Sequence, residues 1–138
     1  MFRIIYTSRA SRAFDRAEMR QLCDLSTKRN TEDDVTGLFL YDGIRFLQAL
    51  EGKQSVVEAA MSRIENDERH YDIVFMHKAA IDAREFPSWS MDTPLNPDDV
   101  AEEFVEKVKA DVSAVTDPSM RAMFIGLAKL AATSRNRA

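Results

Sequence analysis

The amino-acid sequence predicts an α+β fold, a ferredoxin-like βαββαββ sandwich with two C-terminal helices. Two observations favour this fold. Segments that alternate between apolar and polar residues are interleaved with segments whose apolar residues recur at helical spacing, in the order β-α-β-β-α-β-β. From about residue 96 onward only the helical spacing remains. The length of 138 residues suits one domain, and a hydrophobic content of 45% can build its core.

The first strand is predicted over residues 2–8 and the first helix over residues 15–29. The strand places Tyr6 on one face with its apolar neighbours, because side chains alternate along a strand. Asp15 is a suitable N-cap for the helix. The helix then carries a stripe at helical spacing: Met19, Leu22 and Leu25-Ser26. We expect Asn30 to end this helix, and residues 31–34 to form a loop.

A hairpin and a second helix follow. Strands are predicted over residues 35–41 and 44–51, and the Asp42-Gly43 dipeptide between them suits a tight turn. The second helix is predicted over residues 54–66, with an inner stripe of Val56, Val57, Ala60, Met61 and Ile64. A long strand from residue 71 to about 81 and a short strand near residues 88–92 complete the pattern.

The remaining segment predicts two amphipathic helices. Asn96-Pro97 and Asp117-Pro118 each resemble a cap followed by proline at the first helical position. The apolar stripes are Val100, Phe104, Val105 and Val108 in one helix, and Met120, Met123, Phe124, Leu127 and Leu130 in the other. Packing onto the sheet would bury these stripes, and so would an output or dimer surface; the two are compatible. We therefore divide the chain into a domain of residues 1–95 and a helical extension of residues 96–138.

One polar residue stands out within the predicted strands. Ile44, Phe46, Gln48 and Leu50 share one face of their strand, so an uncharged amide points where apolar side chains point. Leaving such a group buried without partners costs roughly 1–3 kcal/mol. A core amide bonded to the backbone would satisfy it. A ligand presenting both a donor and an acceptor would do so equally well.

Composition excludes several classes of protein. A net charge of −4 argues against direct nucleic-acid binding. One cysteine cannot form an intramolecular disulfide and fits a reducing cytoplasm. The apolar runs are too short to span a membrane, and the N-terminus lacks the plan of a signal peptide. No metal-ligand spacing, glycine-rich phosphate loop or Ser/His/Asp triad stands out. We expect a cytoplasmic protein.

Five short motifs, in order and at matching spacing, resemble those of the BLUF family, blue-light sensors that hold a flavin. They cover roughly the first two-thirds of the chain: Ile5-Tyr6-Thr7-Ser8, Asn30 before Val35-Thr36-Gly37-Leu38, Phe46-Leu47-Gln48-Ala49-Leu50-Glu51-Gly52, Asp67-Glu68-Arg69-His70 and Phe86-Pro87-Ser88-Trp89-Ser90-Met91. The resemblance implies a photoreceptor, not an enzyme, that binds FAD noncovalently.

The resemblance also implies roles for individual residues. Tyr6 gives an electron to the light-excited flavin, a proton follows through Gln48, and the amide rotates or tautomerises. Asn30 bonds the pyrimidine edge of the flavin, and Leu22 and Ile64 sandwich its ring. Arg63 lies near a flavin carbonyl, and Asp67 lies near the ring or the ribityl chain. Trp89 and Met91 relay the signal, and the sequence leaves open which of them faces the flavin.

Plainer interpretations exist for several of these residues. Leu22, Ile64, Trp89 and Met91 could be core, and Arg63 and Asp67 could form an exposed ion pair, worth at most about 0.5 kcal/mol. Arg69, His70 or Lys28 could contact a phosphate. The LOV photoreceptors, which form a cysteine–flavin bond, also contain Arg-Phe-Leu-Gln in their motif, but here residues 45–48 follow Gly43-Ile44 and not Asn-Cys. Cys23 is remote from this motif and is interpreted as a small packing residue.

The output of such a sensor needs a partner. The roughly 45 residues after the sensor are too few for a cyclase or phosphodiesterase domain. We therefore expect the output to pass through an unknown downstream protein or through a change of oligomer, and we expect the chain to form a homo-oligomer. Two alternatives are a light-insensitive ferredoxin-like module that binds a ligand or protein, and a small enzyme that uses a flavin or phosphate.

Overall fold

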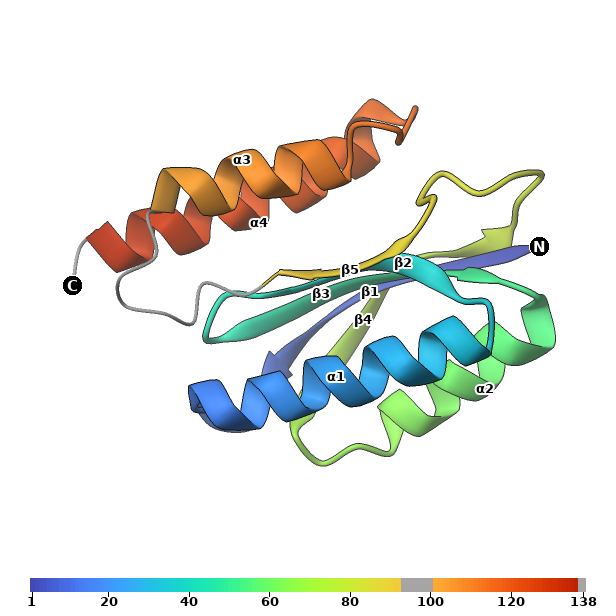
Figure 1. The fold of residues 1–138 in the computed structure, drawn as a ribbon, viewed down its shortest axis with the longest axis horizontal. Helices are drawn as coiled ribbons and strands as arrows, with labels where there is room; N and C mark the ends of the chain where they lie inside the picture. Colours follow the sequence, from blue (N-terminus) through green and yellow to red (C-terminus); the bar gives the residue numbers. More distant parts are fainter. Residues whose placement is uncertain (93–100, 137–138) are drawn as a thin grey trace.

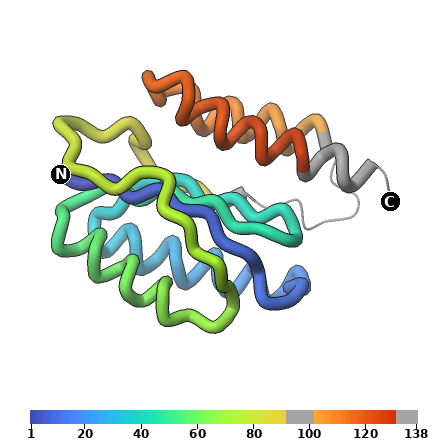
Figure 2. Tube along the Cα trace, turned by 180° about the vertical axis from the view of Figure 1, so that it is seen from behind, coloured from blue at the N-terminus to red at the C-terminus, as the bar shows by residue number. Residues whose placement is uncertain are grey.

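The computed structural model describes the backbone of residues 1–92 and 101–136 as a mixed sheet with helices on both faces (Figure 1). In chain order the elements are β1 (Phe2–Ala10), α1 (Arg16–Glu32), β2 (Thr36–Tyr41), β3 (Arg45–Gly52), α2 (Gln54–Glu65), β4 (His70–Ala80), β5 (Trp89–Asp92), α3 (Ala101–Asp111) and α4 (Pro118–Asn136). Helices α1 and α2 cover one face of the sheet, and α3 and α4 cover the other (Figures 1 and 2). The α+β prediction, with two C-terminal helices, is confirmed.

The sheet places β3 at its centre. The strand order is β4-β1-β3-β2-β5, antiparallel except for the parallel pair β2–β5. Gln48 therefore lies in the central strand. In register, it stands opposite Tyr6 of β1 on one side and Phe39 of β2 on the other.

Helix α1 begins where its cap predicts and ends later than predicted. The Asp15 carboxylate accepts a hydrogen bond from the Glu18 amide at 2.8 Å, and the Glu18 side chain accepts from the Asp15 amide, a complete capping box. The helix runs to Glu32, so the expectation that Asn30 ends it is wrong. Asn30 lies in the last turn. The chain leaves the helix at Asp34, whose φ of +56° is left-handed.

Ile44 lies in the hairpin turn and not in the strand, so its predicted position is wrong. Tyr41 pairs with Phe46, and the Asp42 amide donates to the Arg45 carbonyl at 3.2 Å, so Gly43 and Ile44 form the centre of the turn. Ile44 is 57% exposed and does not share the buried face of Gln48. Alternation predicts a face only within a strand, and β3 begins one residue later, at Arg45.

The C-terminal helices pack onto the sheet face opposite α1 and α2. Ile5, Leu38, Leu40, Leu47 and Ala49 of the sheet form one core with Phe104, Val108, Val112, Met120, Phe124 and Ala128. Packing onto the sheet, one of the two alternatives for the stripes, is therefore observed. Leu130, predicted to belong to the buried stripe of α4, is 53% exposed. Ala128, four residues after Phe124, occupies the buried position instead.

The start of the extension is only partly described. The Asp117 carboxylate accepts from the Ser119 amide at 2.9 Å and caps α4, as predicted. The Asn96-Pro97 cap, Val100 and the proposed domain boundary at 95/96 lie outside the described residues. Within the described parts of the chain, none of the helices is long and apolar enough to cross a membrane.

Candidate functional site

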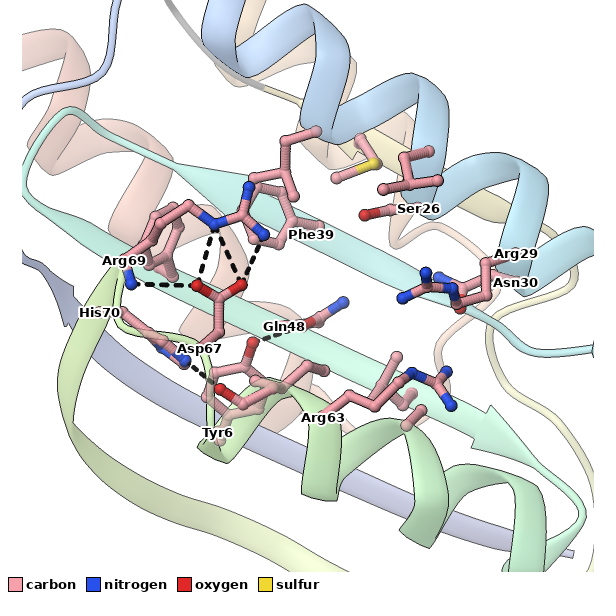
Figure 3. A pocket seen from close by; sticks show the side chains of 17 residues that line it. Tyr6, Ser26, Arg29, Asn30, Phe39, Gln48, Arg63, Asp67, Arg69 and His70 are labelled. Carbon is pink, nitrogen blue, oxygen red and sulfur yellow. Dashed lines mark hydrogen bonds and ion pairs between the residues drawn. The ribbon is translucent and has the colours of Figure 1, made fainter.

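A cavity lies between α1 and α2 over the floor of the central strands (Figure 3). Its volume is about 830 Å³ when the mouth open to solvent is included, within the range of cofactor sites. The lining residues are Tyr6, Leu22, Leu25, Ser26, Arg29, Asn30, Phe39, Phe46, Gln48, Leu50, Ala60, Arg63, Ile64, Asp67, Arg69, His70 and Met91. All of the predicted cofactor-binding residues border this one cavity.

Tyr6 and Gln48 form a directly bonded pair on its floor. The Tyr6 hydroxyl donates to Gln48 Oε1, and the two residues are 2% and 5% exposed. Burial raises the pKa of Tyr6 above its ordinary value, and the negative charge of Asp67 raises it further, so the phenol keeps its proton. Within the described residues, Gln48 Nε2 donates to no protein atom. This donor is available to a group in the cavity.

Apolar side chains on the facing helices form the two walls. Leu22 and Leu25 come from α1, and Ala60 and Ile64 come from α2. Leu25 is half-exposed at the mouth. Opposed aliphatic walls above a floor with a few polar groups suit a flat aromatic ring system.

One end of the cavity carries an amide and two guanidinium groups. Figure 3 shows Arg29 and Asn30 from α1 together, with Arg63 reaching toward them from α2. Asn30 is 6% exposed; its backbone carbonyl accepts from the Val35 amide at 2.8 Å, while its side chain bonds to no described residue. Arg63 lies 3.9 Å from the Asp33 carboxylate.

At the other end of the cavity, Asp67 and Arg69 form an ion pair. The Asp67 carboxylate accepts from the Arg69 guanidinium at 2.5–3.0 Å, and this bond holds the pKa of Asp67 below its usual value. Asp67 is therefore ionised. The ion pair between Arg63 and Asp67 that helical spacing allows is not formed, since each has another partner.

His70 holds the cavity together and has no free nitrogen. Its Nδ1 lies 2.7 Å from Ser8 Oγ, and its Nε2 lies 2.5 Å from the Ile64 carbonyl oxygen at the end of α2. It thereby ties α2 to β1. Of the three residues considered for phosphate, Arg69 and His70 border the cavity, whereas Lys28 is not among the lining residues.

The two predicted relay residues differ in position. Met91 borders the cavity, and its sulfur accepts from Thr27 Oγ1 of α1 at 3.8 Å. Trp89 packs beside the cavity against the two apolar clusters under α1 and α2, and its buried indole N–H has no partner among the described residues. In this structure Met91, not Trp89, faces the site.

Sequence reasoning missed several lining residues. Arg29, Ser26 and Phe39 border the cavity, and the sequence pattern alone assigns none of them a role there. Ser26, Arg29 and Asn30 lie four, seven and eight residues after Leu22, so the helical period from Leu22 could have found them. Phe39 could be found only from the strand register, which pairs it with Gln48.

Neither Cys23 nor a metal-binding cluster borders the cavity among the residues that the structure describes. Cys23 is half-buried on α1 and is not among the residues that line the cavity. Across residues 1–92 and 101–136, no group of three or more His, Cys, Asp or Glu side chains is placed to hold a metal ion.

Comparison with known proteins adds independent findings. The family model described as "Sensors of blue-light using FAD", BLUF, matches residues 1–92. The photoactivated adenylate cyclase subunit beta of Euglena gracilis is 33% identical over 89 residues, which are 64% of this chain and 10% of that protein. The chain thus spans about a tenth of this relative's length.

Two solved structures share the fold over nearly their whole length. The structure of "BlrP1 BLUF" has a TM-score of 0.71 at 25% identity, covering 95% of this chain and 89% of that one. The dark-state structure of BlrB, a BLUF protein, has a TM-score of 0.67 at 25% identity and covers 96% of each chain. Both likenesses extend beyond residue 92 into the C-terminal helices.

Proposed function

The chain belongs to the BLUF family, the sensors of blue light using FAD, and on this premise we propose that it is a blue-light photoreceptor that binds FAD noncovalently between α1 and α2. The observation that carries the proposal is the buried Tyr6–Gln48 hydrogen bond on the cavity floor, with Gln48 Nε2 left for a ligand. FAD is proposed over FMN because the family description names it.

The residues of the cavity fit a flavin. A flavin ring is flat and apolar on its faces, as are the walls formed by Leu22 and Ile64. Its pyrimidine edge alternates carbonyl and N–H groups, which the unpartnered amide of Asn30 can match with one donor and one acceptor. Arg63 would donate to a carbonyl at the same end, and Asp67 would accept from a hydroxyl at the other.

The chemistry at the floor requires no covalent bond to the protein. When bound, the flavin supplies the absorption of blue light and an excited state that accepts an electron. Tyr6 would be the source of that electron, and its phenolic proton would follow through Gln48. Return of the electron and a proton would restore Tyr6 and would leave Gln48 rotated or tautomerised, so that its donor and acceptor ends face different partners.

The output is proposed to be binding and not catalysis. The cyclase relative extends far beyond the matched segment, so its named activity is not transferred to this chain. A rearranged Gln48 would change the hydrogen bonds offered to Met91 and so the position of β5. We propose that this change reaches a downstream protein, or alters the oligomeric state, through α3 and α4, with Trp89 and Met91 as relay.

Cofactor analysis tests the proposal. The purified protein is expected to be yellow and to release unmodified FAD when denatured, because no cysteine borders the cavity. Apoprotein should regain its colour when FAD is added. A colourless protein that cannot be reconstituted would support a light-insensitive module instead, and flavin that stays attached after denaturation would contradict noncovalent binding.

A further inference from the structure

The segment between β4 and β5 is bonded to the central strand by a buried carboxylate. Glu51 of β3 is 0% exposed. It accepts from Arg3 Nε at 2.7 Å, from the Phe86 amide at 2.7 Å and from the Glu85 amide at 3.0 Å. Arg3 is itself buried and pairs with Glu51 across the β1–β3 ladder. A buried charge with this many donors is a fixed anchor.

The same segment is bonded to the C-terminal helices on its other side. The Glu85 carboxylate accepts from the Thr116 hydroxyl in the connection between α3 and α4. The Phe86 ring lies edge-on to Phe124 of α4, with 5.7 Å between centroids. Residues 84–86 therefore bridge the sheet and the α3–α4 pair.

Glu51 is also close to the proposed switch. Gln48 and Glu51 are three residues apart on one strand, so they project from opposite faces of the sheet. Gln48 lines the cavity under α1 and α2, whereas Glu51 faces the side of α3 and α4. A displacement of the β3 backbone at Gln48 can therefore reach Glu51, on the opposite face, through three residues of the same strand.

We propose that Glu51 is a positioning residue for output, which couples the flavin cavity to α3 and α4 through residues 84–86. The inference rests on the proposed photoreceptor function and adds a route that does not pass through Met91 and β5. When Gln48 changes partners, β3 shifts, Glu51 moves with it, and the bond between Glu85 and Thr116 is weakened or strengthened. The docked α3–α4 pair is the element whose equilibrium is biased.

Two hydroxyl deletions in the α3–α4 connection test this route. Thr116→Val removes the donor to Glu85, whereas Ser113→Ala removes a hydroxyl that, among the described residues, bonds only to the Ala110 carbonyl near the end of α3. Hydrogen exchange of residues 101–136 is measured by mass spectrometry in the dark and under blue light, beside the absorption spectrum. Both variants should keep the flavin red shift. Ser113→Ala should keep the light-induced change in exchange, and Thr116→Val should lose most of it.

Glu51→Gln tests the anchor itself. It keeps the side-chain volume, removes the charge that Arg3 faces, and should raise dark exchange at residues 84–86 and 101–136 while the red shift persists. The light-induced change in exchange should be no smaller in the double variant, Glu51→Gln with Thr116→Val, than in Glu51→Gln alone, because both substitutions interrupt one route. Additive losses, or a wild-type light response in Thr116→Val, would overturn the inference. A wild-type protein with a red shift but no light-induced exchange change would overturn this inference alone, whereas absence of the red shift would remove the proposed function and the inference with it.

Discussion

At the scale of single residues, the proposed switch depends on an amide whose two ends have different partners. Gln48 Oε1 accepts from Tyr6, and Nε2 faces the cavity. An amide can exchange these ends at little cost in packing, because oxygen and NH₂ are similar in size. A leucine at the same place would fill the space without offering either end.

Tyr6→Phe and Gln48→Leu are each expected to retain flavin and to lose the normal photocycle. Phenylalanine removes the transferable phenolic proton, and leucine removes the switchable amide. The walls and Asn30 are untouched by either change, so flavin affinity should survive. Flavin content and the light-minus-dark spectrum check this, and a normal light-induced shift in either variant would contradict the assigned roles.

Asn30→Ala is expected to weaken flavin binding about tenfold or more, because its amide would make two hydrogen bonds of about 0.5–1.5 kcal/mol net each, and 1.4 kcal/mol corresponds to tenfold in Kd. Titration of apoprotein with FAD measures the change. Asn66→Ala is the matched control, since that amide bonds to the Ser62 carbonyl outside the cavity. Equal affinities for wild type and Asn30→Ala would show that Asn30 serves only the helix end.

The buried phenol also predicts how stability depends on pH. Burial raises the pKa of Tyr6, whereas the unfolded phenol ionises near pH 10. Above about pH 10 the folded state keeps a proton that the unfolded state has lost, so stability falls with pH by up to about 1.4 kcal/mol per pH unit from this group.

Urea unfolding of the apoprotein between about pH 9 and 11 measures that slope, around the ordinary tyrosine pKa. Tyr6→Phe removes the ionisable group. The free energy of unfolding is therefore expected to fall less steeply with pH, by the slope that one proton contributes. Identical slopes in the two proteins would mean that the folded state does not hold this phenol protonated.

At the scale of secondary-structure elements, the sequence predicts correctly those features that depend only on residues close together in the chain. Asp15 and Asp117 cap helices as predicted, because a cap depends only on neighbouring residues. Ile44 was misplaced because a turn is defined by which residues pair across the hairpin. Phe39 was missed because its place at the cavity depends on the strand register that pairs it with Gln48.

The position of β5 could not be predicted from sequence either. This strand joins the sheet parallel to β2 at its edge, and that pairing brings Met91 opposite Phe39 and to the cavity. Trp89 lies on the same face two residues earlier, so alternation alone could not separate the two. Only the packing of α1 distinguishes them, through Thr27 against the Met91 sulfur.

Met91→Ala is expected to keep the flavin red shift and to weaken the light-dependent hydrogen exchange of residues 101–136. Alanine removes the thioether that borders the cavity while leaving Tyr6 and Gln48 in place. Exchange under light and dark measures the effect. Met76→Ala, an exposed methionine on β4, is the control and should behave as wild type. Full light-dependent exchange in Met91→Ala would assign the output to another route, such as the Glu51 anchor.

At the scale of the whole molecule, the sheet separates two functions. The cavity and its switch lie under α1 and α2, and the α3–α4 pair lies on the opposite face (Figures 1 and 2). Among the described residues, residues 84–86 bond both to the anchor at Glu51 and to Thr116, and β5 lies at the edge of the sheet as the second proposed route. The fold class and the seven proposed cofactor-binding residues, all of which border the cavity, could be predicted from the sequence. The side on which the tail packs could not, because either face of a sheet can bury an apolar stripe.

The absorption spectrum of the full chain before, during and after blue light tests the central claim most directly. The Tyr6–Gln48 switch predicts that the flavin bands shift to longer wavelength under light and return in the dark, and that Cys23→Ala leaves this cycle intact. A bleached spectrum typical of a cysteine adduct, or bands that do not shift in flavin-loaded protein, would contradict the account.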